Sequence, residues 1–152
     1  MQYHLAQVNV GEILGPTDDP IMAEFMAALD KINAIADQSP GFVWRLQSDD
    51  GNATDYRPYE NPNIMLNLSV WESVDALHAY VYKTVHLEYV KRRKEWFQRF
   101  GQPHMCLWWI PAGHIPPIEE AITKLNHLTE HGPTPESFTF AKRFPCDVKA
   151  VS

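Results

Sequence analysis

The residues from Ile64 to Trp71 alternate strictly in a pattern of period two, which predicts a β-strand. Successive side chains of a strand point to opposite faces of its sheet. One face carries Ile64, Leu66, Leu68 and Val70, and the other carries Met65, Asn67, Ser69 and Trp71. The first set is aliphatic and indicates a core. The second set is mixed in polarity, so we expect another part of the structure to cover it.

Strand and helix patterns follow one another in an order that is typical of one fold class. Strands are predicted at Gln2–Val10, Phe42–Gln47, Ile64–Trp71 and Met105–Pro111, with a short last strand at Phe138–Phe140. Helices are predicted from Asp19-Pro20 to about Asp37, from Ser73 to Lys83, over Val85–Phe100 and over Ile118–Glu130. This order predicts an α+β, ferredoxin-like split βαβ fold with an antiparallel sheet and an appended helix.

In that fold the helices cover one face of the sheet, so the other face needs cover of its own. A second copy of the chain would provide it, which predicts a homodimeric α/β barrel. The chain of 152 residues is expected to form a single domain over residues 1–145, followed by a C-terminal tail over residues 146–152.

Charge and composition exclude several classes of function. The net charge of −6 argues against a nucleic-acid partner. We find no apolar run long enough to span a membrane and no signal-peptide pattern, so a soluble cytoplasmic protein is expected. The two cysteines, Cys106 and Cys146, imply no disulfide framework, and Cys106 is expected to be an inert thiol in the core.

The segment Val85–Phe100 divides into two faces at helical spacing. The charged face carries Glu88, Lys91, Arg92, Lys94, Glu95, Gln98 and Arg99. The aromatic face carries His86, Tyr89, Val90, Arg93, Trp96, Phe97 and Phe100, with Tyr82 one turn upstream. A helix buries its apolar stripe, so a histidine and an arginine within that stripe need a partner: a carboxylate, a ligand or a metal.

His86 and Arg93 are therefore the predicted catalytic residues. They are two helical turns apart, or about 10 Å along one face. Arg93 would hold an anionic group, and His86 would act as a base, a hydrogen-bond donor or a metal ligand. The alternative is structural, with His86 bonded to a backbone carbonyl and Arg93 paired with a carboxylate at the edge of the core.

Aromatic side chains are the predicted walls of a substrate-binding pocket beside these two residues. The helical ones are Tyr82, Tyr89 and Trp96, and those from predicted strands are Trp44, Trp108 and Trp109. Tryptophans in strands also serve as core or interface residues, so that alternative stays open. No metal is predicted, because His127 and His131 lack an intervening Glu after the first histidine and lie next to the end of their helix.

Several segments resemble the bacterial domain-of-unknown-function family 3291. They are YHLAQVNVG, SPGFVWRLQ, LSVWESVDALHAYVYKTVHLEYVKRRKEWF, WWIPAGHIP and HGPTPESFTF. The resemblance covers nearly the whole chain, to about Pro145. It implies the dimeric α/β-barrel superfamily, which includes antibiotic-biosynthesis-type monooxygenases and haem-degrading enzymes. His86, Arg93 and Trp96 fall within the family's block of the form H…RR.EWF.

Three functions are consistent with these observations. The first is a cofactor-independent, monooxygenase-like enzyme that acts on a flat aromatic substrate, with His86 as the base. The second is a non-catalytic binder of haem or of another aromatic or apolar small molecule; haem enters only by analogy with the superfamily. The third is a structural dimer whose pocket is closed by tyrosine and tryptophan packing.

Native mass spectrometry of the freshly purified protein tests the predicted assembly. We expect a dimer, because the sheet face without helices needs cover. A stoichiometric adduct on that dimer would give the mass of the ligand. A bare monomer would contradict the barrel.

Overall fold

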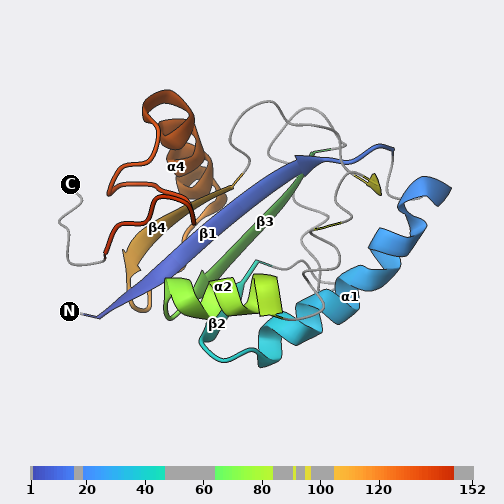
Figure 1. Ribbon diagram of the computed structural model, residues 1–152, viewed down its shortest axis with the longest axis horizontal. Coiled ribbons are helices and arrows are strands. Elements are labelled where there is room, and N and C mark those ends of the chain that lie inside the picture. The colour runs from blue at the N-terminus through green and yellow to red at the C-terminus, as the bar shows by residue number, and fades with distance from the viewer. Residues whose placement is uncertain are drawn as a thin grey trace.

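The structure is a computed structural model that describes residues 2–15, 19–46, 64–83, 91, 95–96 and 105–145. Its strands are β1 (Tyr3–Glu12), β2 (Phe42–Arg45), β3 (Ile64–Trp71) and β4 (Met105–Pro111). Its helices are α1 (Ala23–Gln38), α2 (Val74–Lys83) and α4 (Ile118–His131), and a short 3-10 helix, η1 (Pro20–Met22), precedes α1. Figure 1 shows the long strands β1 and β3 side by side at the centre of the molecule.

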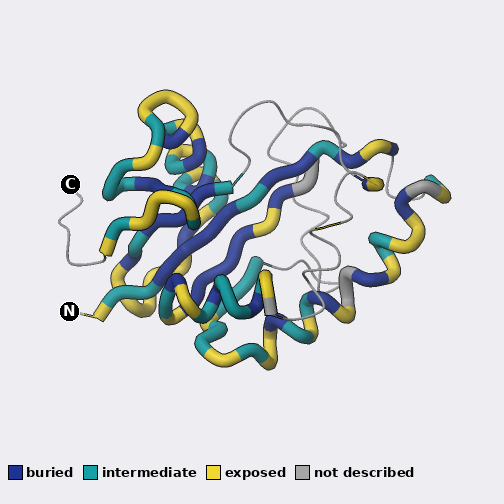
Figure 2. Tube along the Cα trace, in the orientation of Figure 1, coloured by how far each residue is buried: buried dark blue, intermediate teal, exposed yellow. Residues whose placement is uncertain are grey.

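The four strands form one sheet in the order β2-β3-β1-β4, and every neighbouring pair is antiparallel. β1 and β2 are therefore parallel to each other with β3 between them, and β3 and β4 are parallel with β1 between them. This is the split βαβ arrangement, so the predicted α+β ferredoxin-like fold is confirmed. Figure 2 shows that β1 and β3 are buried along most of their length.

α1 and α2 pack on the same face of the sheet, as the fold class predicts. Ile32 of α1 and Leu77 of α2 share a buried cluster with Trp71 of β3 and Leu107 of β4. In Figure 1, α2 crosses in front of the sheet. We call this side of the sheet the α1/α2 face.

The appended helix α4 packs on the opposite face, which we call the α4 face. Its buried residues Ala121, Leu125 and Leu128 join a cluster formed by apolar side chains of the strands. Those strand residues are Ala6, Val8, Val10, Leu66, Leu68, Val70, Cys106, Trp108 and Ile110. We expected a second copy of the chain to cover this face, and the structure shows that α4 of the same chain packs on it. The dimer itself stays a prediction.

Cys106 lies within the cluster of the α4 face and is fully buried. Burial raises the pKa of its thiol to about 12, and the charge of Lys124 opposes this shift. The thiolate, which is the reactive form, is therefore scarce near neutral pH. This agrees with the prediction of an inert thiol in the core.

The two ends of α1 differ in how well their sequence signals predicted them. Asp19-Pro20 was expected to start the helix, but the chain first forms η1, and α1 begins at Ala23 without a side-chain cap. At the other end, Gly41 has a φ of +83°, and an added Cβ there would come within 2.5 Å of the Ala76 side chain. Glycine therefore both ends the turn and allows α2 to approach β2.

Three residues of the predicted Val85–Phe100 helix are described, and their burial agrees with its two predicted faces. Trp96, on the aromatic face, is buried, whereas Lys91 and Glu95, on the charged face, are exposed. Within the described parts of the chain, no helix has the length and apolar character needed to cross a membrane.

The packing of α4 is tested by replacing Leu125 with alanine. Leu125 is 5% exposed against the α4 face, so Leu125→Ala should lower the free energy of unfolding by about 2–5 kcal/mol. The neighbouring Asn126 is exposed, and Asn126→Ala is the matched control. Chemical denaturation measures both variants, and equal stabilities would contradict the assigned face.

Candidate functional site

Polar side chains gather at the centre of the α1/α2 face, where apolar residues would be expected. Gln7 and Asn9 belong to β1, and Asn67 and Ser69 belong to β3. The register pairs Gln7 with Ser69 and Asn9 with Asn67, so the four residues occupy two adjacent rows of the sheet. We call Gln7, Asn9 and Asn67 the amide cluster.

Hydrogen bonds fix the orientation of these amides. The Nε2 atom of Gln7 donates to Oδ1 of Asn67 at 2.7 Å and to Oγ of Ser69 at 2.7 Å. The Nδ2 atom of Asn9 donates to Oε1 of Gln7 at 3.1 Å and lies 3.4 Å from Oδ1 of Asn67. Both strands therefore contribute to one network, which is anchored on Gln7.

Burial changes sharply across the network. Gln7 and Ser69 are only 3% and 6% exposed, whereas Asn9 is half-buried and Asn67 is exposed. Because Asn67 lies on a central strand, its exposure means that the helices leave this part of the α1/α2 face open. The Asn67 oxygen accepts from Gln7 and Asn9, and its Nδ2 atom makes no hydrogen bond with a described residue.

The arrangement thus presents two N–H donors of Asn67 at an open surface, held in place by a buried network. Such fixed donors bind a ligand oxygen and stabilise negative charge that develops on it. Preorganisation matters here, because the amide does not have to reorient when the charge forms.

Aromatic rings adjoin the network on the same face. The indole of Trp71 is 1% exposed, donates to Oγ of Ser69 at 2.9 Å and stacks on Tyr80 at 5.1 Å between ring centroids. The Tyr80 hydroxyl donates to the carbonyl of Ile32 at 3.2 Å. Burial raises the pKa of Tyr80 far above its ordinary value, so this phenol stays protonated and cannot serve as a base.

Two of the predicted pocket residues lie on this face. Tyr82 of α2 is 39% exposed and contacts His78 and Phe140, with ring centroids 4.5 and 6.0 Å away. Trp109 of β4 is half-buried, and its Nε1 atom donates to the carbonyl of Phe144 at 2.8 Å.

Two other predicted residues lie on the α4 face. Trp108 is 1% exposed, and its Nε1 atom donates to a carboxylate oxygen of Glu120 at 2.9 Å. Trp44 packs against the same cluster. The structure therefore does not bring Trp44 and Trp108 together with Tyr82, because the sheet separates them. Trp108 and Trp109 are consecutive in a strand, so their side chains must point to opposite faces.

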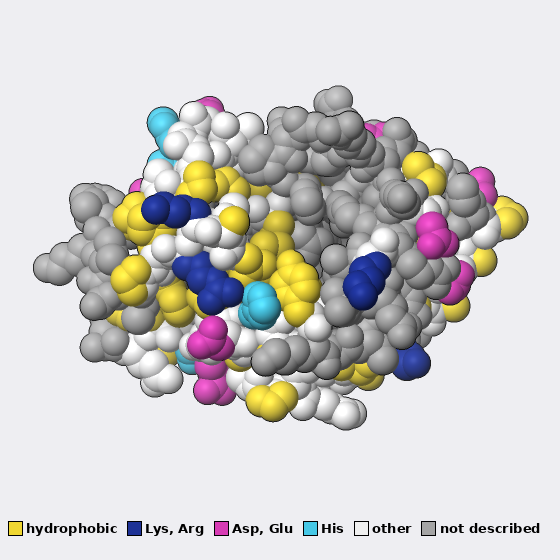
Figure 3. Space-filling view, in the orientation of Figure 1, with side chains coloured by type: hydrophobic (Ala, Val, Ile, Leu, Met, Phe, Trp, Pro, Cys, Tyr) yellow, Lys and Arg dark blue, Asp and Glu magenta, His cyan; other side chains and the backbone are white. Residues whose placement is uncertain are grey.

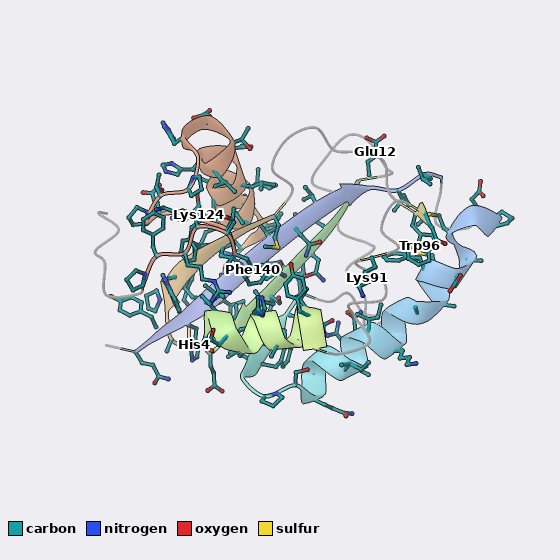
Figure 4. The ribbon with its side chains drawn as sticks, in the orientation of Figure 1. His4, Glu12, Lys91, Trp96, Lys124 and Phe140 are labelled. Atoms are coloured by element: carbon teal, nitrogen blue, oxygen red, sulfur yellow. The ribbon has the colours of Figure 1, made fainter. Side chains whose placement is uncertain are left out.

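Trp96 packs in a separate small cluster with Ile13 and Met22, and its ring centroid is 5.5 Å from that of Phe25. Figure 4 shows Trp96 beside α1, well apart from Phe140. The other three predicted residues, His86, Tyr89 and Arg93, lie outside the described residues, so their roles stay predictions.

The helical histidines make local contacts. His127 and His131 have ring centroids 4.6 Å apart, and the Nδ1 atom of His127 lies 3.2 Å from a carboxylate oxygen of Glu136. The Nε2 atom of His127 lies 3.1 Å from the Thr134 hydroxyl. Among the residues that the structure describes, no three potential ligands are grouped to hold a metal ion.

Comparison with known proteins assigns the chain to a family. Residues 4–152 match the family described as Domain of unknown function (DUF3291). The chain belongs to this family. The search of curated proteins gave no match.

Solved structures share the fold. A protein of unknown function from Nitrosomonas europaea, NE2512, aligns with a TM-score of 0.50 at 12% identity, covering 76% of this chain and 97% of that one. SnoaB, a cofactor-independent oxygenase from Streptomyces nogalater, aligns with a TM-score of 0.48 at 18% identity, covering 75% of this chain and 97% of its own. At such low identities the likeness to NE2512 shows the fold alone.

The sequence contains a signal for the amide cluster, although none of the cluster's residues was among the predicted site residues. Asn67 and Ser69 interrupt one face of a strand whose other face is aliphatic, and Gln7 and Asn9 do the same in the first strand. Each pair alone is typical of an exposed strand face. Only the pairing of the two strands shows that these polar residues meet one another.

Ser69→Ala tests whether the network is as well ordered as its geometry indicates. The substitution removes the acceptor of both the Gln7 amide and the Trp71 indole, so it should lower the free energy of unfolding by about 1–3 kcal/mol. Thr123→Ala removes an exposed hydroxyl that bonds only within α4 and should have little effect. Chemical denaturation compares the two, and a neutral Ser69→Ala would contradict the network.

Proposed function

We propose that this protein binds a flat, ring-containing small molecule over the amide cluster and oxidises it with O₂ without a cofactor. The observation that carries this proposal is the exposed Asn67 amide, backed by buried Gln7 and Ser69, on a sheet face that the helices otherwise cover. The resemblance to a superfamily that includes monooxygenases supports the same class of reaction.

The chemistry that fits such a site begins with a carbon acid that is conjugated with a ring carbonyl. Asn67 would hold the oxygen atom and stabilise the negative charge that reaches it when a C–H proton leaves. The resulting carbanion is electron-rich enough to reduce O₂ and form a C–O bond. Loss of water from the hydroperoxide then leaves a ketone, so that R₂CH₂ and O₂ give R₂C=O and H₂O.

The proton needs a base, and His86 is the predicted one. An imidazole titrates near neutral pH, which suits a general base. Arg93 would hold an anionic part of the same substrate. Both assignments rest on the helical pattern of Val85–Phe100, and Tyr80 is unsuited to the role of base because its phenol is buried and bonded to a carbonyl.

Anthrone is a suitable test substrate, because it is flat and its methylene is acidic through conjugation with the ketone across the central ring. We expect the purified protein to consume O₂ with anthrone and to form anthraquinone, measured with an oxygen electrode and by absorbance. Asn67→Ala should lower kcat by about 100-fold, the typical loss when one oxyanion donor is removed. His86→Ala should abolish turnover and leave thermal unfolding unchanged. Asn126→Ala, far from the site on α4, is the control.

Each outcome of this assay distinguishes one hypothesis from another. Oxygen uptake no faster than without protein would contradict the oxygenase, and anthrone binding without uptake would instead support a non-catalytic binder. Full activity of His86→Ala would show that another group is the base. Full activity of Asn67→Ala would show that the amide cluster takes no part in the reaction.

A further inference from the structure

The residues that follow α4 return to the α1/α2 face and lie along the edge of β4. Leu107 and Phe138 exchange two backbone hydrogen bonds of 2.8 Å, and the Trp109 indole donates to the carbonyl of Phe144. We call the segment from Phe138 to Phe144 the C-terminal strap. Because it is bound to β4 at both ends, its position on the sheet is fixed.

The middle of the strap reaches across to α2. The Phe140 ring lies 5.4 Å from the ring of His78 and 6.0 Å from that of Tyr82. The Arg143 guanidinium lies 5.8 Å from the Phe140 ring centroid and 3.5 Å from a carboxylate oxygen of Asp75. Figure 4 shows Phe140 in front of the sheet, above α2. The strap therefore joins β4 to α2 over the α1/α2 face.

Strand register places this strap level with the amide cluster. Phe138 is bridged to Leu107, Leu107 pairs with Gln7, and Gln7 pairs with Ser69. These residues form one row across the sheet, in which neighbouring strands are about 4.8 Å apart. Two spacings put the strap backbone about 10 Å from that of Gln7. Leu107 fills the row between them, so the strap and Gln7 lie two strands apart on the same face of the sheet.

Tyr82 leaves an aromatic surface exposed at this place. Tyr82 is 39% exposed, one of the most exposed large apolar side chains described, although Phe140 and His78 lie beside it. Figure 3 shows hydrophobic side chains, a histidine and basic side chains gathered over α2 and the strap. A flat aromatic ring can stack on such a surface at little entropic cost, because the protein rings are already held in place.

We propose that Phe140 and Tyr82 form the wall of the site that selects planar ligands, and that Arg143 is a positioning residue that holds Phe140 in place. This inference rests on the proposed function, since it assigns the specificity of the same site. Phe140 contributes its ring face to the ligand. Arg143 acts through its contacts with Phe140 and Asp75 and does not touch the ligand.

A pair of probes with one carbon skeleton tests the wall. 2-Naphthol is planar and decahydro-2-naphthol is not, and both carry one hydroxyl for Asn67 to bind. We measure both affinities by isothermal titration calorimetry and compare their ratio. Wild-type protein should prefer 2-naphthol, and Phe140→Leu should lower that preference about fivefold, since only the planar ring loses its stacking partner.

Further variants separate the role of the wall from a loss of folding. Tyr82→Leu should lower the preference to a similar degree, and it tests the wall independently if Phe140→Leu proves unstable. Arg143→Ala should lower the preference by releasing Phe140. Lys142→Ala is the matched control, because Lys142 lies over Phe144, 5.7 Å from its ring centroid, and should leave the ratio unchanged. Thermal unfolding checks each variant.

The possible results distinguish this inference from the proposed function. If wild-type protein binds neither probe, both the small-molecule site and its wall are wrong. If wild-type protein prefers 2-naphthol and both Phe140→Leu and Tyr82→Leu keep that preference, the site stands and the wall is wrong. A loss of preference in Lys142→Ala equal to that in Arg143→Ala would overturn the role of Arg143.

Discussion

The structure depends on the burial of both faces of its two central strands. β1 and β3 pair along eight residues, from Leu5 with Trp71 to Glu12 with Ile64. Since strand side chains alternate, this pairing aligns an aliphatic set on one face and a mixed set on the other. The aliphatic set packs under α4, and the apolar members of the mixed set, such as Trp71, pack against α1 and α2. The helices α1, α2 and α4 are placed by the face that each covers.

The mixed face combines a core with a polar site. Its apolar residues, such as Leu5 and Trp71, pack against the helices, and its polar residues follow further along the same strands. Burying amides costs free energy unless they are hydrogen-bonded, and Gln7 meets this condition through Asn67 and Ser69. Leucines at these positions would stabilise the fold about as well as this polar network. The presence of the network therefore favours a role in binding.

The chain beyond the fourth strand adds cover on both sides of the sheet. The ferredoxin-like order is complete at β4, and NE2512 aligns with about three quarters of this chain. α4 then covers the α4 face, and the C-terminal strap covers the edge of β4 on the α1/α2 face. One continuous segment thus contributes cover to both faces of the sheet, and it brings Phe140 to the proposed site.

Local sequence patterns predicted the four strands, the ends of α2 and α4 to within a few residues, and the burial of Trp96, because each depends on periodicity along a single element. The consecutive positions of Trp108 and Trp109 in one strand also require their side chains to point to opposite faces. Pairing between strands that are distant in the sequence decided which side chains meet at the candidate site. Gln7 and Asn67 are sixty positions apart, and only the register of β1 with β3 joins their amides. Likewise, no pattern within residues 138–144 indicates that Phe140 meets Tyr82; the edge of β4 and the position of α2 determine that contact.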